Sequence, residues 1–324
     1  MKTQLMKRAA ALCLAVVLTL SVNAAALFGG KEKAQPAEGS PTAQALEIRT
    51  YRGIPYHAQF LAAGGEGEDL TFTVEKEPKK GTVQIDGASF TYTPEGDSTG
   101  SDSFTYTVTD SAGRVSQPAT VSVTIEKAKS GVTYADTADS TAAVAAQDLA
   151  EAGIFTGAKI GDQYYFEPDK PVSRSEFLAM VMETAGDEPT AVTMTGFCDD
   201  AAIPTWAKGS VSSALKAGVI QGERAPTGAP VFSAGTDITC GEATVMLDRL
   251  LNMADVPLEA AGLSVQGHWA GQAAANLAAS GVLTPDQSTS AALSEPLTRA
   301  AAAELLDGAL DVLAAREARS WLPW

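Results

Sequence analysis

Two arginines, Arg174 and Arg299, occupy the same position in a short motif that the chain repeats three times. The copies span residues 171–177, 238–243 and 297–302, and the second has Cys240 at the arginine position. Each motif precedes a helical pattern, so each arginine would lie beside the free amides of a helix N-terminus, which favour a carboxylate or phosphate. A cation in a first helical turn is unfavourable by itself. The motif therefore predicts an anion-binding pocket, with a solvent-exposed arginine as the alternative.

The other motif residues are typical of helix capping. Ser173 and Glu176 have the spacing of a capping box, as do Thr239 and Glu242, and this explains these residues without a ligand. The third copy has Ala301 in place of the glutamate, which weakens its cap. The arginine is therefore the informative residue of the motif.

Each motif stands at the same place in a longer repeat. An alanine-rich helix is expected first, a β-like loop follows, and the motif then opens a second helix. A glycine follows each first helix and predicts a left-handed C-terminal cap. The expected first helices are residues 142–152, 206–217 and 269–280, their glycines are Gly153, Gly218 and Gly281, and the second helices are residues 174–184, 240–252 and 299–313.

Aromatic and acidic phrases precede the first helices, namely Tyr134-Ala135-Asp136, then Phe197-Cys198-Asp199-Asp200 with Trp206-Ala207, then His268-Trp269-Ala270. With the motif, they make the three repeats resemble surface-layer homology (SLH) modules. The first copy lacks the tryptophan, and Gln266 and Gly267 stand where the third should have an aspartate. The resemblance implies an all-α, pseudo-threefold assembly of three SLH repeats, at residues 132–190, 195–256 and 262–314.

The resemblance also implies that grooves between neighbouring repeats bind anionic, pyruvylated secondary cell-wall polysaccharide. The candidate ligand-binding residues are then Arg174, Arg299, Asp136, Glu176, Asp200, Trp206 and Trp269. The two tryptophans would stack on sugar, and the alternative is that they are core aromatics at helix starts. Because Cys240 replaces an arginine, we expect one or two working grooves, with Arg174 the best candidate and Arg299 the next.

Residues 46–127 have a period of two and predict an all-β, Ig-like antiparallel sandwich. Alternating Thr, Val, Phe and Tyr residues form short runs, separated by turns rich in Gly, Pro and Asp. With Tyr92-Thr93-Pro94 and the run from Gly100 to Asp110, this segment resembles bacterial Ig-like or cadherin-like repeats. Some such repeats bind calcium, and Asp97, Asp102 and Asp110 are the candidate ligands. We favour turn chemistry for these aspartates, and expect no cofactor.

The N-terminal segment predicts secretion. Lys2, Lys7 and Arg8 precede a short apolar run, so residues 1–26 are typical of a signal peptide. An uncleaved anchor is the alternative, disfavoured by the shortness of the run. Residues 27–45 predict a flexible linker and residues 315–324 a tail. The mature chain has no further membrane-spanning run, and its two cysteines, Cys198 and Cys240, are compatible with a disulfide or with two buried thiols.

The function predicted from these features is non-catalytic. The net charge of -16 argues against nucleic-acid binding, and no metal-ligand spacing, phosphate-binding loop or nucleophile motif is present. We expect a secreted protein of the cell wall and cell surface (S-layer), anchored by its repeats to secondary cell-wall polysaccharide. The sandwich would be a spacer or adhesion module that contacts other surface proteins. The alternative is a structural or protein-interaction module whose degenerate repeats no longer bind glycan.

Overall fold

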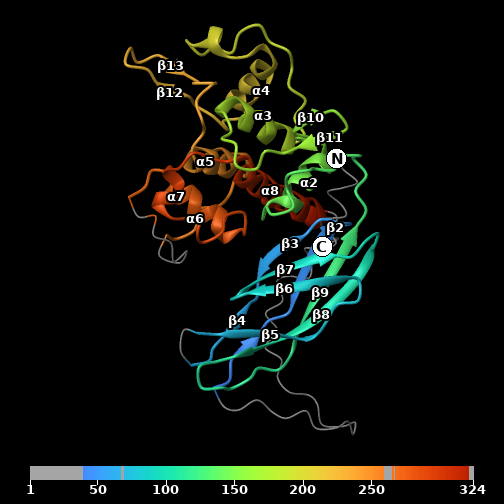
Figure 1. Cartoon of the computed structure of the whole chain (residues 1–324). Coiled ribbons are helices and arrows are strands. Elements are labelled where there is room, and N and C mark those ends of the chain that lie inside the picture. The colour runs from blue at the N-terminus through green and yellow to red at the C-terminus, as the bar shows by residue number, and fades with distance from the viewer. Residues whose placement is uncertain (1–38, 67–68, 259–264, 266, 321–324) are drawn as a thin grey trace. The chain divides into compact units, whose positions relative to one another are not determined.

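The computed structural model describes residues 39–66, 69–258, 265 and 267–320. The predicted signal peptide, residues 27–38 of the predicted linker and residues 321–324 of the predicted tail lie outside the described residues. The described chain divides between Gly131 and Val132 into an N-terminal β unit and a C-terminal helical unit (Figure 1).

The β unit is a sandwich of two sheets. One sheet has the order β2-β9-β8-β5 and the other β3-β7-β6, and only the β2–β9 pair is parallel among the described strand pairs of these sheets. A short ribbon of β1 and β4 accompanies them. The strands are β1 (Thr42–Ala43), β2 (Leu46–Tyr51), β3 (Tyr56–Gln59), β4 (Ala62–Ala63), β5 (Thr71–Lys76), β6 (Gly81–Asp86), β7 (Ser89–Pro94), β8 (Gly100–Thr109) and β9 (Ala119–Glu126).

Alternation along the strands builds the core of the sandwich. In β9, Val121, Val123 and Ile125 are buried while the threonines and serine between them are exposed. Aromatic rings from both sheets fill the interior, and Phe60 and Phe90 stack with centroids 4.5 Å apart. The prediction of a β-rich N-terminal domain is confirmed.

The sandwich begins earlier in the chain than its sequence pattern predicted. Strand β1 lies within residues 27–45, which we expected to be a flexible linker. The hydroxyl of the buried Tyr106 donates to the carbonyl oxygen of Gln44 at 2.6 Å, and accepts from the amide of the same residue at 3.2 Å. This polar anchor holds a segment whose composition carries little strand signal.

The helical unit contains seven α-helices within the described residues, together with two β-hairpins. The helices are α2 (Ala143–Ala152), α3 (Arg174–Thr184), α4 (Thr205–Lys216), α5 (Cys240–Leu251), α6 (Gly271–Ala279), α7 (Ser290–Ser294) and α8 (Arg299–Ser320). The hairpins are β10 (Ala158–Ile160) with β11 (Gln163–Tyr165), and β12 (Glu223–Arg224) with β13 (Pro230–Val231).

Three details differ from the sequence prediction. The unit is not all-α, because the first two repeats form hairpins in their loops. The third repeat has the short helix α7 there instead, and its Leu293 is fully buried. Helix α8 continues to Ser320, seven residues past the expected end at Leu313 (320 − 313) and into the predicted tail.

The expected helix ends are present. Gly153, Gly218 and Gly281 have φ values of 77°, 76° and 79°, the left-handed conformation that a residue without a Cβ adopts at low cost. Ser173 with Glu176, and Thr239 with Glu242, form complete capping boxes. The predictions of the glycine caps and of the two capping boxes are confirmed.

The three motifs meet in a closed ring of backbone hydrogen bonds. The amide of Val172 donates to the carbonyl oxygen of Leu297 at 3.0 Å, that of Leu297 to Ile238 at 2.8 Å, and that of Ile238 to Val172 at 3.0 Å. All three side chains are buried. Each motif therefore satisfies the backbone of the next, in the cyclic order of repeat one, two, three and one.

Helix packing follows the same cyclic order. Helix α3 packs on α4, α5 on α6 and α8 on α2, so each motif helix contacts the first helix of the following repeat. Helices α3, α5 and α8 also contact one another. We name the three regions where a motif meets the next repeat after the residue at the arginine position: the Arg174 junction, the Cys240 junction and the Arg299 junction.

Candidate functional site

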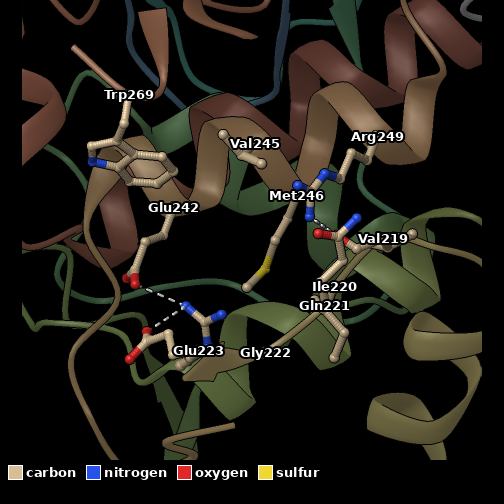
Figure 2. Close-up of a pocket in the computed structure, with 11 residues that line it drawn as sticks. Val219, Ile220, Gln221, Gly222, Glu223, Glu242, Val245, Met246, Arg249 and Trp269 are labelled. Atoms are coloured by element: carbon tan, nitrogen blue, oxygen red, sulfur yellow. Dashed lines mark hydrogen bonds and ion pairs between the residues drawn. The ribbon is translucent and has the colours of Figure 1, made fainter. Parts of the chain in front are cut away.

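A pocket of about 180 Å³ lies at the Arg174 junction. Figure 2 shows its lining, which comes from all three repeats. We call it the Arg174 pocket, and its lining residues are Arg174 of repeat one, Val219, Ile220, Gln221, Gly222, Glu223, Glu242, Val245, Met246 and Arg249 of repeat two, and Trp269 of repeat three.

Arg174 is buried, and two carboxylates face its guanidinium. Its side chain is 9% exposed, and Nη1 lies 2.9 Å from Glu242 Oε1 and 3.8 Å from Glu223 Oε1. The guanidinium carbon lies 5.5 Å from the centroid of the Phe232 ring, within range of a cation–π contact. Nε is buried without a hydrogen-bond partner. The alternative of a solvent-exposed arginine is therefore wrong for this residue.

Glu242 is fixed from two sides. The amide of Thr239 donates to its Oε2 at 3.0 Å, which completes the capping box, and Arg174 donates to its Oε1. One carboxylate thus takes part in the N-terminal cap of α5 and also compensates the charge of a buried arginine from the preceding repeat.

The two candidate tryptophans are exposed, and the alternative that they are core residues is wrong. Trp206 is 59% exposed and Trp269 is 65% exposed, whereas Ala207 and Ala270 directly after them are buried. Trp269 lies beside His268, with ring centroids 5.7 Å apart. An exposed indole is a suitable surface for stacking on the apolar face of a sugar ring.

At the Arg299 junction the arginine is held differently. Its side chain is 11% exposed, and Nη1 donates to the carbonyl oxygen of Phe166 at 3.0 Å and to Glu167 Oε2 at 2.6 Å. Hydrogen bonds from Lys170 and then Arg299 hold the pKa of Glu167 below its usual value. By the equivalence of the repeats, Trp206 corresponds here to Trp269 of the Arg174 junction, since α4 packs on α3 as α6 packs on α5.

The candidate acidic residues use their oxygens inside the protein. Asp136 accepts from the amides of Phe166 and Glu167 at 2.9 and 2.8 Å, and Glu176 accepts from the amide and hydroxyl of Ser173. Both residues therefore shape the backbone around the motif.

Asp200, the candidate acidic residue of the second repeat, is not the counterpart of Asp136. That place belongs to Asp199, which accepts from the amides of Phe232 and Ser233 at 2.9 and 2.8 Å. Asp200 instead binds Lys208 Nζ at 2.5 Å and Thr195, and these contacts lower its pKa to about 2.

The Cys240 junction lacks the residues that distinguish the Arg174 pocket. Cys240 replaces the arginine, Ala301 replaces Glu242, and Thr141 replaces the tryptophan and donates to Glu304 at 2.8 Å. Both cysteines are free thiols, with Cys198 exposed and Cys240 buried. Burial raises the pKa of the Cys240 thiol. The three replacements belong to different repeats, so the sequence motif did not reveal that they share one junction.

Arg249 is a pocket residue that the sequence analysis missed. It lies in the last turn of α5, is exposed, and lines the Arg174 pocket. The equivalent residues are Glu183 in α3 and Gly308 in α8, counted from the aligned motifs. The change from a negative charge at Glu183 to a positive charge at Arg249 is visible in the sequence. It lies outside the motif, so a comparison of the motifs alone did not reveal it.

The candidate calcium ligands of the sandwich have other partners. Asp97 pairs with Arg52 at 3.2 Å, and Asp110 binds Arg114 and the amide of Glu66. Asp102 accepts from two lysine amides and from the hydroxyl of Tyr92; although burial raises the pKa of Asp102, these hydrogen bonds keep it below its usual value. Over the described part of the chain, no cluster of three or more His, Cys, Asp or Glu residues is arranged for a metal ion.

One known family model matches the β unit. Residues 41–127 match the family model of the bacterial cadherin-like domain, which agrees with the sandwich and with the early strand β1. No surface-layer homology repeat is detected by the same comparison. None of the curated proteins matches the chain. Among the helices of the described residues, none is long and apolar enough to cross a bilayer.

Three solved structures are distantly similar to parts of the chain. The endo-fucoidan hydrolase MfFcnA4 of glycoside hydrolase family 107 is 22% identical over 29% of this chain and 14% of its own, with a TM-score of 0.24. The related MfFcnA9 is 18% identical over 30% and 18%, with a TM-score of 0.23. A putative alpha-galactosidase from Bacteroides fragilis is 11% identical over 47% and 36%, also at 0.23. The chain spans under a fifth of both fucoidan hydrolases, and these likenesses carry no argument about activity.

Proposed function

We propose that this is a secreted, non-catalytic protein of the bacterial cell envelope whose helical unit binds anionic wall polysaccharide. The three repeats act as surface-layer homology modules, and pyruvylated secondary cell-wall polysaccharide is their ligand. The cadherin-like domain is a spacer or adhesion module that contacts other surface proteins.

One observation carries this proposal. A buried arginine of the repeated motif and an exposed tryptophan, Arg174 and Trp269, line the same pocket although they belong to different repeats. An aromatic surface beside cationic groups suits a sugar that carries an acidic substituent. An acidic chain binds an acidic polymer only where cations are locally placed, and this pocket contains two arginines.

The test is binding of the full secreted chain to purified pyruvylated wall polysaccharide. We expect the wild type to bind, and Trp269→Ala and Arg174→Ala to bind more weakly. Ile160→Ala changes an exposed apolar residue of a hairpin outside the pocket and is the matched control. Equal binding by all four chains would overturn the assignment of the pocket, and no binding by the wild type would overturn the glycan function.

A second candidate function follows from the ion pairs. Both motif arginines contact carboxylates of the protein, Arg174 through Glu242 and Arg299 through Glu167. If these ion pairs only hold neighbouring repeats together and no glycan binds beside them, the repeats form a structural or protein-interaction module. Two results together would favour this alternative. The wild-type chain would not bind wall polysaccharide, and the wild type and Trp269→Ala would bind a purified envelope protein with the same affinity.

A further inference from the structure

We propose that Arg249, which lies outside the repeated motif, binds the anionic group of the ligand in the Arg174 pocket, whereas Arg174 neutralises Glu242. This inference rests on the proposed function, since it concerns the acidic glycan bound at the same pocket. It assigns two different roles to the two arginines of one site.

The charge of Arg174 is already compensated. Its Nη1 is 2.9 Å from Glu242, a second carboxylate at Glu223 lies 3.8 Å away, and only 9% of its side chain is exposed. A ligand carboxylate that displaced Glu242 would also leave that residue without its cation while the capping box still holds it in place. Breaking such a buried pair is unfavourable, so Arg174 is a poor donor to an incoming anion.

Arg249 has the opposite properties. It is exposed, and Nη1 donates a long hydrogen bond of 3.5 Å to the carbonyl oxygen of Val219. The neighbouring Asp248 attracts its charge without forming an ion pair. Within the described residues no carboxylate forms an ion pair with it. A guanidinium in this state offers parallel N–H donors that match a carboxylate or phosphate.

The placement of Arg249 suits a sugar ligand. In Figure 2, Trp269 and Arg249 lie on opposite sides of the view. Val245 and Met246, which belong to α5 as Arg249 does, lie between them. A sugar ring stacked on the indole would direct an anionic substituent toward the guanidinium. The ligand class is a sugar with a compact acidic group, which is a pyruvyl ketal in the proposed polymer.

The residue at the position of Arg249 distinguishes the Arg174 junction from the Arg299 junction. Glu183 takes the place of Arg249 at the Arg299 junction, and both residues are exposed in the last turn of their helices. By the equivalence of the repeats, an acidic ligand would meet a carboxylate at this position there instead of a guanidinium, and like charges oppose its binding. The Arg174 pocket is then the principal anionic-glycan site of the two junctions that keep the arginine and the tryptophan.

The first experiment measures the affinity of the full chain for pyruvylated polysaccharide by calorimetry. We expect Arg249→Glu to weaken binding about 10- to 100-fold, the range for loss of a hydrogen bond to a charged group, and Arg249→Lys to weaken it less. Unchanged affinity in Arg249→Glu would overturn the assignment. Failure of the wild type to bind would instead reject the proposed function, and this inference with it.

Binding measurements with different polymers identify the anionic group that Arg249 contacts. Polymer from which mild acid has removed the pyruvyl ketal should bind more weakly, and Arg249→Glu should then no longer matter. A phosphate-bearing wall polymer is the other source of the same chemistry. If Arg249→Glu weakens its binding more than that of the pyruvylated polymer, Arg249 keeps its role and the natural ligand is the phosphate polymer. Equal sensitivity of the pyruvylated and stripped polymers to Arg249→Glu would overturn the role.

The second experiment tests the role of Arg174. Arg174→Met leaves Glu242 uncompensated beside the ligand and should weaken binding, whereas the double variant Arg174→Met/Glu242→Gln should restore affinity to within about threefold of wild type, a small free-energy difference. Glutamine keeps the acceptor of the capping box, and circular dichroism checks folding. A double variant as weak as Arg174→Met would show that Arg174 itself contacts the ligand and would overturn the division of roles.

The third experiment is a gain of binding. Glu183→Arg places the cation of the Arg174 pocket at the equivalent point of the Arg299 junction, and we expect more bound ligand per chain at saturation. The last turn of a helix also favours a cation, so unfolding curves accompany each variant to separate stability from affinity. A Glu183→Arg chain that is as stable as wild type and binds no more polymer would count against the proposal.

Discussion

The hydroxyl of Thr141 donates a 2.8 Å hydrogen bond to Oε1 of Glu304, and so joins the start of repeat one to the last helix of repeat three. Thr141 occupies the position that Trp206 and Trp269 hold in the other repeats, directly before a buried alanine. The Cys240 junction therefore lacks its tryptophan, its arginine and its glutamate together. The differences among the repeats are concentrated in one junction, and the other two each keep an arginine and a tryptophan.

The ring of Val172, Ile238 and Leu297 predicts that the three repeats open together. We expect the amides of these residues to exchange with solvent through one common opening, since each amide donates to the carbonyl oxygen of the preceding motif. Leu297→Ala should lower the free energy of unfolding by about 2–5 kcal/mol and reduce protection at Val172 and Ile238 as well. Hydrogen exchange measured residue by residue checks this.

The control for the ring is Leu215→Ala on α4, at a leucine that is 37% exposed and outside the ring. It should change the free energy of unfolding by about 0.5 kcal/mol or less. Loss of protection at Leu297 alone, with the other two amides unaffected, would mean that the repeats open independently.

Gly222 and Gly218 form a matched pair for testing the pocket wall. Both have positive φ, at 77° and 76°, so alanine costs about 1–2 kcal/mol at either site. At Gly222 a Cβ would also lie 2.4 Å from the Phe197 ring and 2.9 Å from the carbonyl oxygen of Val231, whereas nothing lies within 4 Å at Gly218. Urea unfolding should show a further loss of about 1–3 kcal/mol in Gly222→Ala. Equal losses would indicate that Phe197 moves freely.

The pair of Asp200 and Lys208 predicts a loss of stability in acid. The pKa of Asp200 is lowered from 3.8 to about 2 in the folded chain, first by the hydrogen bond from Lys208 and then by Thr195. A lowered pKa means that this stabilisation is fully present above about pH 4 and is lost as the pH falls toward 2. Asp200→Asn should therefore be less stable than wild type at pH 6, with the difference shrinking between pH 4 and 2.

Unfolding by urea at several pH values measures this difference. Asp162→Asn changes an exposed aspartate in the turn between β10 and β11 and serves as the matched control. A stability gap between wild type and Asp200→Asn that stays constant down to pH 2 would contradict the assignment of the lowered pKa to this ion pair.

Sequence patterns predicted the elements better than the site. The period-two runs of residues 46–127, the capping boxes and the glycine caps depend on local backbone physics, so each could be read from a few neighbouring residues. Strand β1 was missed because its anchor, Tyr106, is far away in the sequence. The site was harder still, because one junction combines residues of three repeats, as Arg174, Glu242 and Trp269 show. Comparing motifs copy by copy therefore assigned each replacement to a repeat and not to a junction.

The joint absence of an arginine and a glutamate from the Cys240 junction has an energetic reason. At the Arg174 junction the equivalent residues, Arg174 and Glu242, form a largely buried pair at 2.9 Å. Removing one partner of such a pair leaves a buried charge and costs about 3–5 kcal/mol, whereas replacing both by apolar residues is often neutral. Cys240 is buried and Ala301 partly buried, as this argument requires.

A double-mutant cycle on Cys240 and Ala301 tests this reasoning. We expect Cys240→Arg to destabilise the chain strongly, since its guanidinium would be buried without a carboxylate. Adding Ala301→Glu should recover part of the loss, with a coupling of about 0.5–3 kcal/mol in urea unfolding. Ala301→Gln supplies a capping acceptor without the charge and should recover less. Additive effects of Cys240→Arg and Ala301→Glu would mean that the two introduced side chains do not form the pair that Arg174 and Glu242 form.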